Sequence, residues 1–295
     1  MKSEGWSAWR AVEGLTFTPA VLAELLDGGQ SFRWYREEDG VWRGTWADIL
    51  VRLRTGAAHP LEWSAPDSIA PRAGRALRHY LAADVDHAAL IDALPWRSDP
   101  HLARCLEAFP GLRILRQPFG ETLLGFLCSA TKQIVQIKQM TALLAERHGD
   151  RIEGTSVHRL PTWEKLATVP EAELRACLLG FRARYIAQTA HYLAAHPGWL
   201  AETEALPYAD AKARLCELPG VGEKVADCVL LFGAGRLEAF PVDVWILKTM
   251  ARRYGLEGWR PAQLAQFGRV HYGALAGLAQ QFLFAWERRI AAKRS

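Results

Sequence analysis

The stretch LPGVGEKVADC, residues 218–228, indicates how the second half of this chain folds. A helical pattern covers 208–216 and stops at Pro219, which cannot continue a helix. We expect Gly220 and Gly222 to take positive φ and to bring the backbone of the turn close to a ligand. A second helical pattern begins at once, so its free N–H groups and positive dipole end would face a phosphate. The pattern predicts a helix–hairpin–helix.

Lys224 lies in the first turn of the second predicted helix, and Cys228 follows one turn later on the same face. A lysine here is typical of a phosphate contact or of a surface position, but it is also a candidate nucleophile. Downstream, Asp243 follows Pro241 and precedes an apolar helical pattern, as an N-cap residue does. A carboxylate near Lys224 would also stabilise a developing cation. The residues alone therefore leave both a phosphate-binding module and a catalytic site open.

Composition and charge allow nucleic-acid binding without requiring it. The net charge is only +4 over 295 residues, so a local basic patch would have to contact DNA. The five cysteines are scattered without C-x-x-C spacing, which argues against a zinc site or a disulfide framework and fits a reducing cytoplasm. No apolar run reaches membrane-spanning length, and the start of the sequence lacks a secretory apolar segment. We expect a cytoplasmic monomer that contacts no membrane.

Two kinds of sequence pattern, one typical of strands and one typical of helices, predict an α+β fold. Residues 17–55 read as strands, with aromatic-rich flanks around Glu38-Asp39-Gly40 that are typical of a hairpin. From about Arg72 the apolar spacing is helical, and 121–148 reads as one helical segment. Further helices are expected over 171–179, 182–195, 208–216, 222–233, 243–254 and 272–292. We predict an antiparallel sheet domain over 1–100 and a helical domain over 101–295, with its hairpin at 208–233.

Further segments make the pattern more specific. In chain order they are GGQSFRW at 28–34, GLRILRQ at 111–117, GFLCSATKQI at 125–134, GFRARY at 180–185 and LAQQFLF at 278–284. Together with the hairpin lysine and the aspartate nineteen positions later, they resemble the 8-oxoguanine DNA glycosylase family of the helix–hairpin–helix superfamily. The resemblance covers nearly the whole chain. It implies a twisted antiparallel sheet followed by an all-α core of two helical subdomains, with duplex DNA containing an oxidised purine as the partner.

The resemblance assigns the catalytic roles to Lys224 and Asp243. Lys224 would attack C1′ of the damaged nucleotide, displace the base and form a Schiff base. Elimination of the 3′-phosphate would follow, which makes the enzyme a glycosylase and a lyase at the apurinic or apyrimidinic (AP) site. Asp243 would stabilise the positively charged sugar and help to position or deprotonate Lys224. The nucleotide must leave the base stack for this chemistry, so a pocket for a flipped base is expected.

The same resemblance places four residues around the flipped base. Cys228 and Phe284 would sandwich it, and Gln280 would read its Watson–Crick edge. The backbone carbonyl of Gly29 would accept the N7–H that 8-oxoguanine has and guanine lacks. Taken alone, Cys228 and Phe284 are more typical of a buried core. Only one of Gln280 and Gln281 is expected to face the pocket, and helix spacing to Phe284 favours Gln280.

Contacts to the DNA backbone follow from the hairpin. Gly220, Val221 and Gly222 would hold a phosphate. A potassium or sodium ion could bridge carbonyls within 216–221 to that phosphate, and no metal is expected for catalysis. Trp245 stands where the family frequently has a histidine near the DNA backbone.

The segment facing the opposite strand departs from the family. Thr131 begins the three residues that replace an asparagine run, and Gln136 stands where an arginine is expected. Phe181 occupies an aromatic wedge position, and Arg182 matches a residue that contacts the orphaned base. One arginine can read cytosine, but the loss of its partners predicts a relaxed preference for cytosine opposite the lesion.

Two other functions compete with this one. An alkylpurine DNA glycosylase of the same superfamily generally uses the aspartate without a lysine nucleophile, so Lys224 argues against it. A non-catalytic damage-binding protein would keep the hairpin but would be expected to lack the lysine or the aspartate, and Lys224 and Asp243 are both present.

Overall fold

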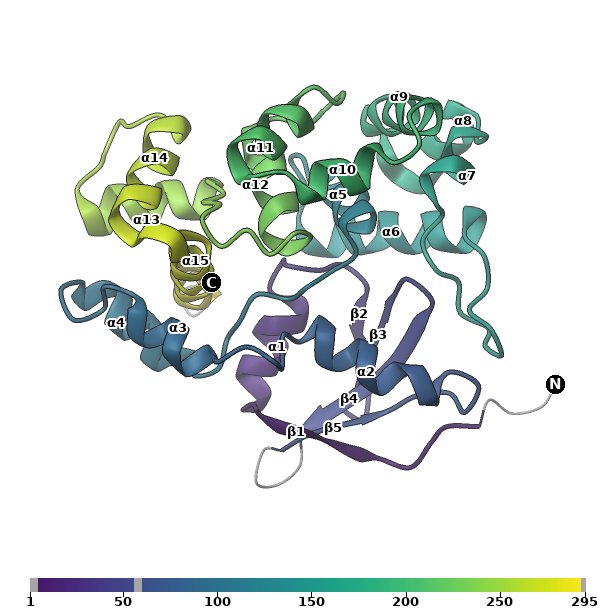
Figure 1. Cartoon of the computed structure of the whole chain (residues 1–295), viewed down its shortest axis with the longest axis horizontal. Coiled ribbons are helices and arrows are strands. Elements are labelled where there is room, and N and C mark those ends of the chain that lie inside the picture. The colour runs from purple at the N-terminus through teal and green to yellow at the C-terminus, as the bar shows by residue number, and fades with distance from the viewer. Residues whose placement is uncertain (1–4, 56–59, 293–295) are drawn as a thin grey trace.

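The computed structural model describes residues 5–55 and 60–292. An antiparallel sheet forms one part and a set of helices forms the other, so the predicted α+β class is confirmed (Figure 1). Within the described ranges, no helix combines the length and the apolar character needed to cross a membrane.

The sheet has five antiparallel strands in the order β1-β5-β4-β3-β2. The strands are β1 Arg10–Thr16, β2 Trp34–Arg36, β3 Trp42–Trp46, β4 Ile49–Thr55 and β5 Pro60–Ser64. The predicted hairpin is formed by β2 and β3, and β4 pairs with β3 in the register that sets Val51 opposite Gly44. A Cβ on Gly44 would lie 2.2 Å from the ring of Trp34, so the glycine makes room for this fully buried indole. The indole N–H donates to the Tyr80 hydroxyl at 3.0 Å and so ties the sheet to α2 (Ala70–Tyr80).

Three elements near the N-terminus differ from the prediction. Part of the predicted strand region is helix α1 (Pro19–Asp27), because Thr18 caps its first turn and Pro19 suits the first helical position. Strands β1 and β5 lie outside the predicted strand region. β1 buries only every third residue, so it lacks the two-residue alternation. β5 begins at Pro60, in a proline-containing stretch that follows the predicted strand region.

The helices form the two expected subdomains. One is centred on the adjacent pair α5 (Phe119–Leu127) and α12 (Glu223–Phe232). The other is centred on α15 (Ala276–Ala292), which packs against α4 (Pro100–Ala108) and α13 (Val244–Tyr254). The remaining α-helices are α3 His87–Ala93, α6 Ile134–His148, α7 Trp163–Ala167, α8 Glu171–Leu174, α9 Arg182–Ala195, α10 Trp199–Ala205, α11 Tyr208–Cys216 and α14 Pro261–Tyr272. Figure 1 shows the second subdomain at the yellow C-terminal end, next to α3 and α4.

Three predicted helical features are wrong in detail. The predicted helix over 171–179 is interrupted, because Leu178 has φ +63° inside it. The segment 121–148 is not continuous, because α5 and α6 are separated by a loop in which Thr131 has φ +56°. Gln133 and Gln136 then form a reciprocal capping box that starts α6. Helix α14 is absent from the predicted segments. Its buried face includes the small residues Ala265 and Gly268, which give a weak apolar stripe.

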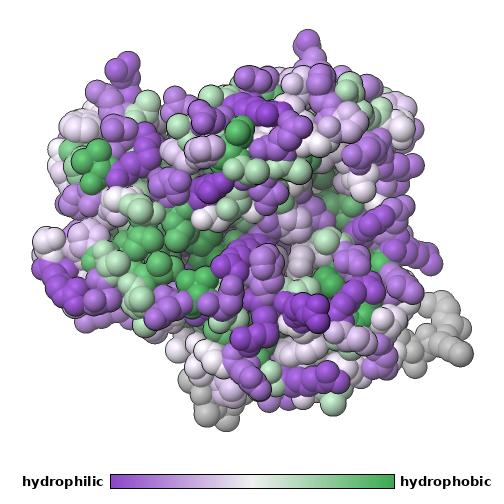
Figure 2. All heavy atoms as spheres, in the orientation of Figure 1, coloured by the Kyte–Doolittle hydropathy of each residue, from purple (hydrophilic) through white to green (hydrophobic). Residues whose placement is uncertain are grey.

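Apolar surface gathers in a hollow beside α3, α4 and α15 (Figure 2). A pocket of about 360 Å³ in this region is lined mainly by apolar side chains, among them Ile91, Trp96, Phe109 and Phe282. None of the predicted site residues lines it, so the hollow is separate from the candidate active site.

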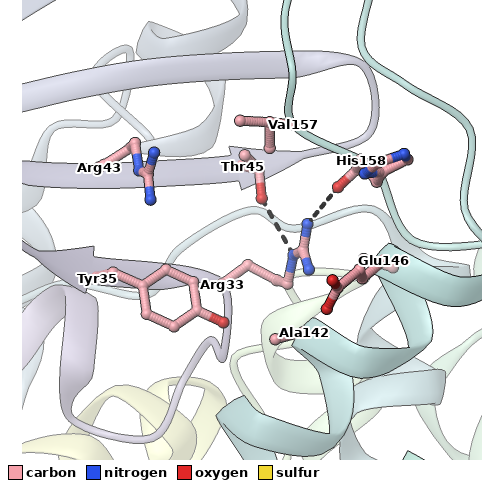
Figure 3. Close-up of a pocket in the computed structure, with 9 residues that line it drawn as sticks. Arg33, Tyr35, Arg43, Thr45, Ala142, Glu146, Val157 and His158 are labelled. Atoms are coloured by element: carbon pink, nitrogen blue, oxygen red, sulfur yellow. Dashed lines mark hydrogen bonds between the residues drawn. The ribbon is translucent and has the colours of Figure 1, made fainter.

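Arg33 holds the sheet against the helices. Its Nε donates to the Thr45 hydroxyl at 3.1 Å, and its Nη1 and Nη2 donate to the carbonyls of Thr141 (3.2 Å) and His158 (2.6 Å). Figure 3 shows this guanidinium in a pocket between the sheet and α6. The three contacts come from three separate segments, so Arg33 fixes the position of the sheet relative to α6.

Glu121 makes a second link between the two parts of the chain. It lies in the first turn of α5 and accepts a hydrogen bond from the Ala47 N–H, at the turn between β3 and β4, at 2.9 Å. Burial raises the pKa of Glu121 to about 7, against a lowering by the nearby Arg33.

We predict that this carboxyl makes stability pH-dependent. The folded pKa lies above the ordinary value of 4.5, so the stabilisation by the bound proton is complete below about pH 4.5 and is lost as pH rises through about 7. The free energy of unfolding of the wild type should therefore fall relative to that of Glu121→Gln by about 2 kcal/mol between roughly pH 5 and 8. Urea unfolding of both proteins measures this difference, and two parallel pH profiles would contradict it.

Candidate active site

The predicted hairpin between α11 and α12 is present, with Gly220 at φ +80°. Gly220 is also required sterically, because a Cβ there would lie 2.8 Å from the ring of Tyr185. The prediction for Gly222 is wrong: its φ of −97° and ψ of 177° are extended backbone that other residues adopt. Gly222 is exposed, and a Cβ at this position would have no other atom within 4 Å. The Val221 N–H donates to the Leu218 carbonyl (3.1 Å), so the N–H groups at the start of α12 are the ones available to an anion.

Lys224 is the second residue of α12 and is half-buried. Its ammonium lies 5.2 Å from the centre of the Phe126 ring, which α5 places beside α12. The aromatic face stabilises a cation at a helix N-terminus, where the dipole disfavours one. The lysine side chain is thus directed toward Phe126 rather than along the exposed glycine turn.

Asp243 caps α13 as predicted. Its Oδ1 accepts from the N–H groups of Trp245 (3.0 Å) and Ile246 (2.9 Å). Burial raises the pKa of Asp243, while the two N–H groups and the charge of Lys224 oppose the rise. The cap fixes the carboxyl group in the wall of the pocket that also contains Lys224.

The six residues predicted to handle the damaged nucleotide all line one small pocket. They come from α12, α15, the start of α13 and the turn after α1, and they are Gly29, Lys224, Cys228, Asp243, Gln280 and Phe284. The free volume is about 50 Å³, which holds only a few water molecules. A purine base can therefore enter only if the pocket opens.

The polar groups of this pocket are suited to a base. The Gln280 Nε2 donates to the Pro241 carbonyl at 3.2 Å, while its buried Oε1 has no partner among the described residues. A buried acceptor without a donor is uncommon in folded proteins and points to a ligand. Gln281 also lines the pocket, so the prediction that only one glutamine faces it is wrong. Adjacent helix positions differ by about 100°, so the pocket is lined by more than one face of α15.

Cys228 presents a neutral thiol to the pocket. Burial raises the pKa of Cys228 to about 11, against a lowering by Lys224. The sulfur therefore offers a polarisable, uncharged surface and does not compete with the lysine as a nucleophile.

A wider cleft of about 880 Å³ opens from the pocket. Besides Lys224 and Asp243, its lining includes Thr131 and Trp245, so two of the predicted DNA contacts lie next to the catalytic candidates. The Lys248 ammonium lies 5.1 Å from the centre of the Trp245 ring and adds positive charge near this edge.

Gln136 and Phe181 lie outside the lining of the cleft. The Gln136 Oε1 accepts from the Gln133 N–H at 3.2 Å, so this side chain caps α6. Phe181 is 51% exposed at the start of α9, as a wedge residue would be.

The sequence analysis did not single out Leu178, which lies near Phe181 in the chain. Leu178 is 59% exposed and holds φ +63°, a strained conformation for leucine. The signal in the sequence is an apolar residue just before the turn at Gly180.

Arg182 is turned inward. It is buried, and its guanidinium donates to the carbonyls of Ala130 and Leu179 and to the hydroxyl of Thr131. Its predicted contact with an orphaned base is therefore not available in this conformation. The arginine instead joins the loop that carries Thr131 to the turn that precedes α9.

Two further cleft residues were missed by the sequence prediction. Phe126 lies within a segment so apolar that it reads as core. Arg288 lies one helical turn beyond Phe284, and its guanidinium is 5.4 Å from the centre of that ring. The spacing of four residues between Phe284 and Arg288 on one helix could have indicated this residue. Across residues 5–55 and 60–292, no group of three or more His, Cys, Asp or Glu side chains is placed to bind a metal ion.

Comparison with known proteins places this chain in a family. The model of the 8-oxoguanine DNA glycosylase N-terminal domain matches residues 15–123, and that of the HhH-GPD superfamily base excision DNA repair protein matches residues 124–269. The N-glycosylase/DNA lyase OGG1 of Arabidopsis thaliana is 34% identical over 289 residues, covering 92% of this chain and 79% of the plant protein. The chain belongs to the 8-oxoguanine DNA glycosylase family. The resemblance predicted from the sequence is thereby confirmed, while the domain boundary at residue 100 stays a prediction.

Two further members extend the comparison. The N-glycosylase/DNA lyase of Saccharomyces cerevisiae is 33% identical over 257 residues, covering 79% of this chain and 68% of the yeast protein. The crystal structure of the Clostridium acetobutylicum 8-oxoguanine glycosylase/lyase, in complex with double-stranded DNA containing cytosine opposite 8-oxoG, has a TM-score of 0.83 at 29% identity and covers 92% of each chain. The sheet followed by a helix–hairpin–helix core is thus the fold of this family.

Proposed function

We propose that this chain is a bifunctional DNA glycosylase of base excision repair that removes 8-oxoguanine from duplex DNA and cleaves the abasic strand. Relatives named N-glycosylase/DNA lyase support the pair of activities, and the clostridial structure with DNA supports the duplex as partner. The observation that carries the assignment to residues is that Lys224 and Asp243 line the same pocket as the unpaired oxygen of Gln280. An alkylpurine glycosylase or a non-catalytic binder would not need this lysine and aspartate together.

Lys224 acts as the nucleophile. Its neutral amine forms a bond from Nζ to C1′ while the bond from C1′ to N9 breaks, and the base leaves with that electron pair and takes up a proton. Opening of the sugar ring gives a Schiff base between Nζ and C1′, and loss of a C2′ proton then expels the 3′-phosphate. Asp243 stabilises the positive charge on the sugar and accepts a proton from the amine.

The pocket walls select the base. The Gly29 carbonyl accepts the N7–H of 8-oxoguanine, and Gln280 Oε1 accepts from the Watson–Crick edge, which in a guanine-type base carries donors. Guanine would leave the Gly29 carbonyl unpaired, at a cost of about 1–3 kcal/mol. Cys228 and Phe284 lie on the two faces of the base. The base enters from a flipped nucleotide once the closed pocket opens.

The opposite strand is read weakly. Thr131 replaces the start of the family's asparagine run, Gln136 caps α6, and Arg182 is engaged with the protein backbone. None of the three presents a free charged group to an orphaned cytosine. The enzyme therefore accepts 8-oxoguanine opposite any base with a relaxed preference.

Other contacts follow the hairpin. The N–H groups at the start of α12, next to Gly222, bind a phosphate, and carbonyls within 216–221 share a potassium or sodium ion with it. Catalysis uses no metal. The protein acts as a monomer in the cytoplasm, and its affinity for DNA falls with salt because phosphate contacts carry much of the binding.

Excision rates on 8-oxoguanine duplexes with cytosine, thymine, adenine or guanine opposite test the proposal. We expect wild-type single-turnover rates within about tenfold of one another, about 1.4 kcal/mol, and no excision by Lys224→Gln. A cytosine preference near 10³-fold, about 4 kcal/mol, would contradict the relaxed preference. Failure to release 8-oxoguanine from every duplex would contradict the proposed function itself.

Gly29→Ala tests the base-reading wall. The added methyl group would lie 3.3 Å from Ile134 Cδ1 and 3.8 Å from Phe284 Cε1, in a residue at φ +100°. We expect excision to fall at least tenfold, about 1.4 kcal/mol, because the wall moves into the space of the base. Gly258→Ala is the control, since Gly258 has φ +80° but nothing within 4 Å of its Cβ position. Equal excision by the two variants would contradict the role of Gly29.

A further inference from the structure

Arg288 joins the two walls of the base pocket. Its Nη1 donates to the Gly28 carbonyl at 2.9 Å and to Glu24 Oε1 at 2.9 Å. The same guanidinium lies 5.4 Å from the centre of the Phe284 ring. Gly28 and Glu24 belong to the sheet part of the chain, whereas Phe284 and Arg288 belong to α15. One side chain therefore contacts both the turn that carries Gly29 and the aromatic wall opposite.

The residue after Gly29 is anchored independently. Gln30 is buried; its Nε2 donates to the Arg113 carbonyl (2.9 Å), and its Oε1 accepts from the Leu115 N–H (3.0 Å). The Gln30 carbonyl accepts from Gln117 Nε2 at 2.7 Å. Gly29 thus lies between two fixed peptide groups. Its own carbonyl receives no hydrogen bond from the residues that the structure describes, which leaves it free for a ligand.

The Arg288–Glu24 pair is poorly accessible to water. The side chains are 27% and 15% exposed, and burial raises the pKa of Glu24 to about 7, against a lowering by Arg288. Loss of Arg288 would leave both a shielded carboxyl group and the Gly28 carbonyl without their donor. The interaction therefore holds the turn at the edge of the cleft that Arg288 also lines.

We propose that Arg288, supported by Glu24, is a positioning residue that sets the direction of the Gly29 carbonyl and so the discrimination of 8-oxoguanine from guanine. This inference rests on the proposed function. The Gly28 carbonyl and the Gly29 N–H share one planar peptide, so holding the former restricts φ of Gly29. Glycine at φ +100° has no Cβ to restrict it further, and release of the Gly28 carbonyl would let the next carbonyl rotate.

The test compares Arg288→Met with Arg288→Lys and with a matched control, Arg214→Met. Arg214 pairs with Glu202 at 2.7 Å, is 28% exposed and lies 5.0 Å from the Trp199 ring centre, so it reproduces the ion pair and the aromatic contact away from the pocket. Each variant is assayed for excision of 8-oxoguanine and for cleavage at a preformed abasic site.

We expect Arg288→Met to lower excision at least tenfold while abasic-site cleavage stays within about twofold, because an abasic site has no base for Gly29 to read. Arg288→Lys should recover part of the loss, since an ammonium can donate to the Gly28 carbonyl, and Arg214→Met should change neither rate. Amide hydrogen exchange over residues 26–31 should rise about tenfold in Arg288→Met and stay unchanged in the control.

Two results would overturn the proposal. Equal losses of excision and abasic-site cleavage would mean that Arg288 only supports the fold, and unchanged hydrogen exchange over 26–31 would mean that it does not hold the turn. Failure of the proposed function is recognised separately, because the wild type would then release no base, while hydrogen exchange would still decide whether Arg288 holds the turn.

Discussion

The position of one backbone carbonyl, that of Gly29, depends on how the sheet and the helices are held together. It belongs to the turn after α1, on the sheet side of the molecule, yet it has to stand in the wall of a pocket built by α12 and α15. Arg33 and Glu121 fix the sheet against the helices, and Gln30 ties the turn itself to the segment before α5. The N-terminal part of the chain therefore supplies one wall of the pocket that the helical core otherwise forms.

The proposed catalytic pair, Lys224 and Asp243, is positioned by helix ends. Lys224 is directed inward because α12 begins at a tight turn and packs against α5, whose Phe126 faces the ammonium. Asp243 is held by two N–H groups at the start of α13. Both residues line the open cleft as well as the small pocket, whose free volume of about 50 Å³ is too small for a purine base. In the proposed reaction, the pocket would open and the nucleotide would unstack at the expense of binding energy from the DNA backbone.

The structure brings the residues named from the sequence into one pocket, whereas parts of the sheet were missed. Lys224 and Asp243 could be named from the glycine turn and the helix start, while Gly29, Cys228, Gln280 and Phe284 were named only through the family resemblance. Strand β1 and helix α1 were missed because burial from tertiary contacts and a Thr18 cap override the local pattern. Arg182 points inward because it contacts the loop at Thr131. Thr131 has a left-handed backbone conformation, and this conformation could not be predicted because the residue is not a glycine. Contacts between residues 260 positions apart, such as Arg288 to Gly28, leave no trace in local sequence.

Borohydride trapping tests the central claim most directly, because reduction converts a transient Schiff base into a stable protein–DNA bond. Incubation of the wild type with an 8-oxoguanine duplex and borohydride, followed by proteolysis and mass spectrometry, identifies the attached residue. The account predicts one cross-linked peptide, modified at Lys224 within residues 218–228, and no adduct in Lys224→Gln. An adduct on another residue, or base release without any trapped species, would contradict it.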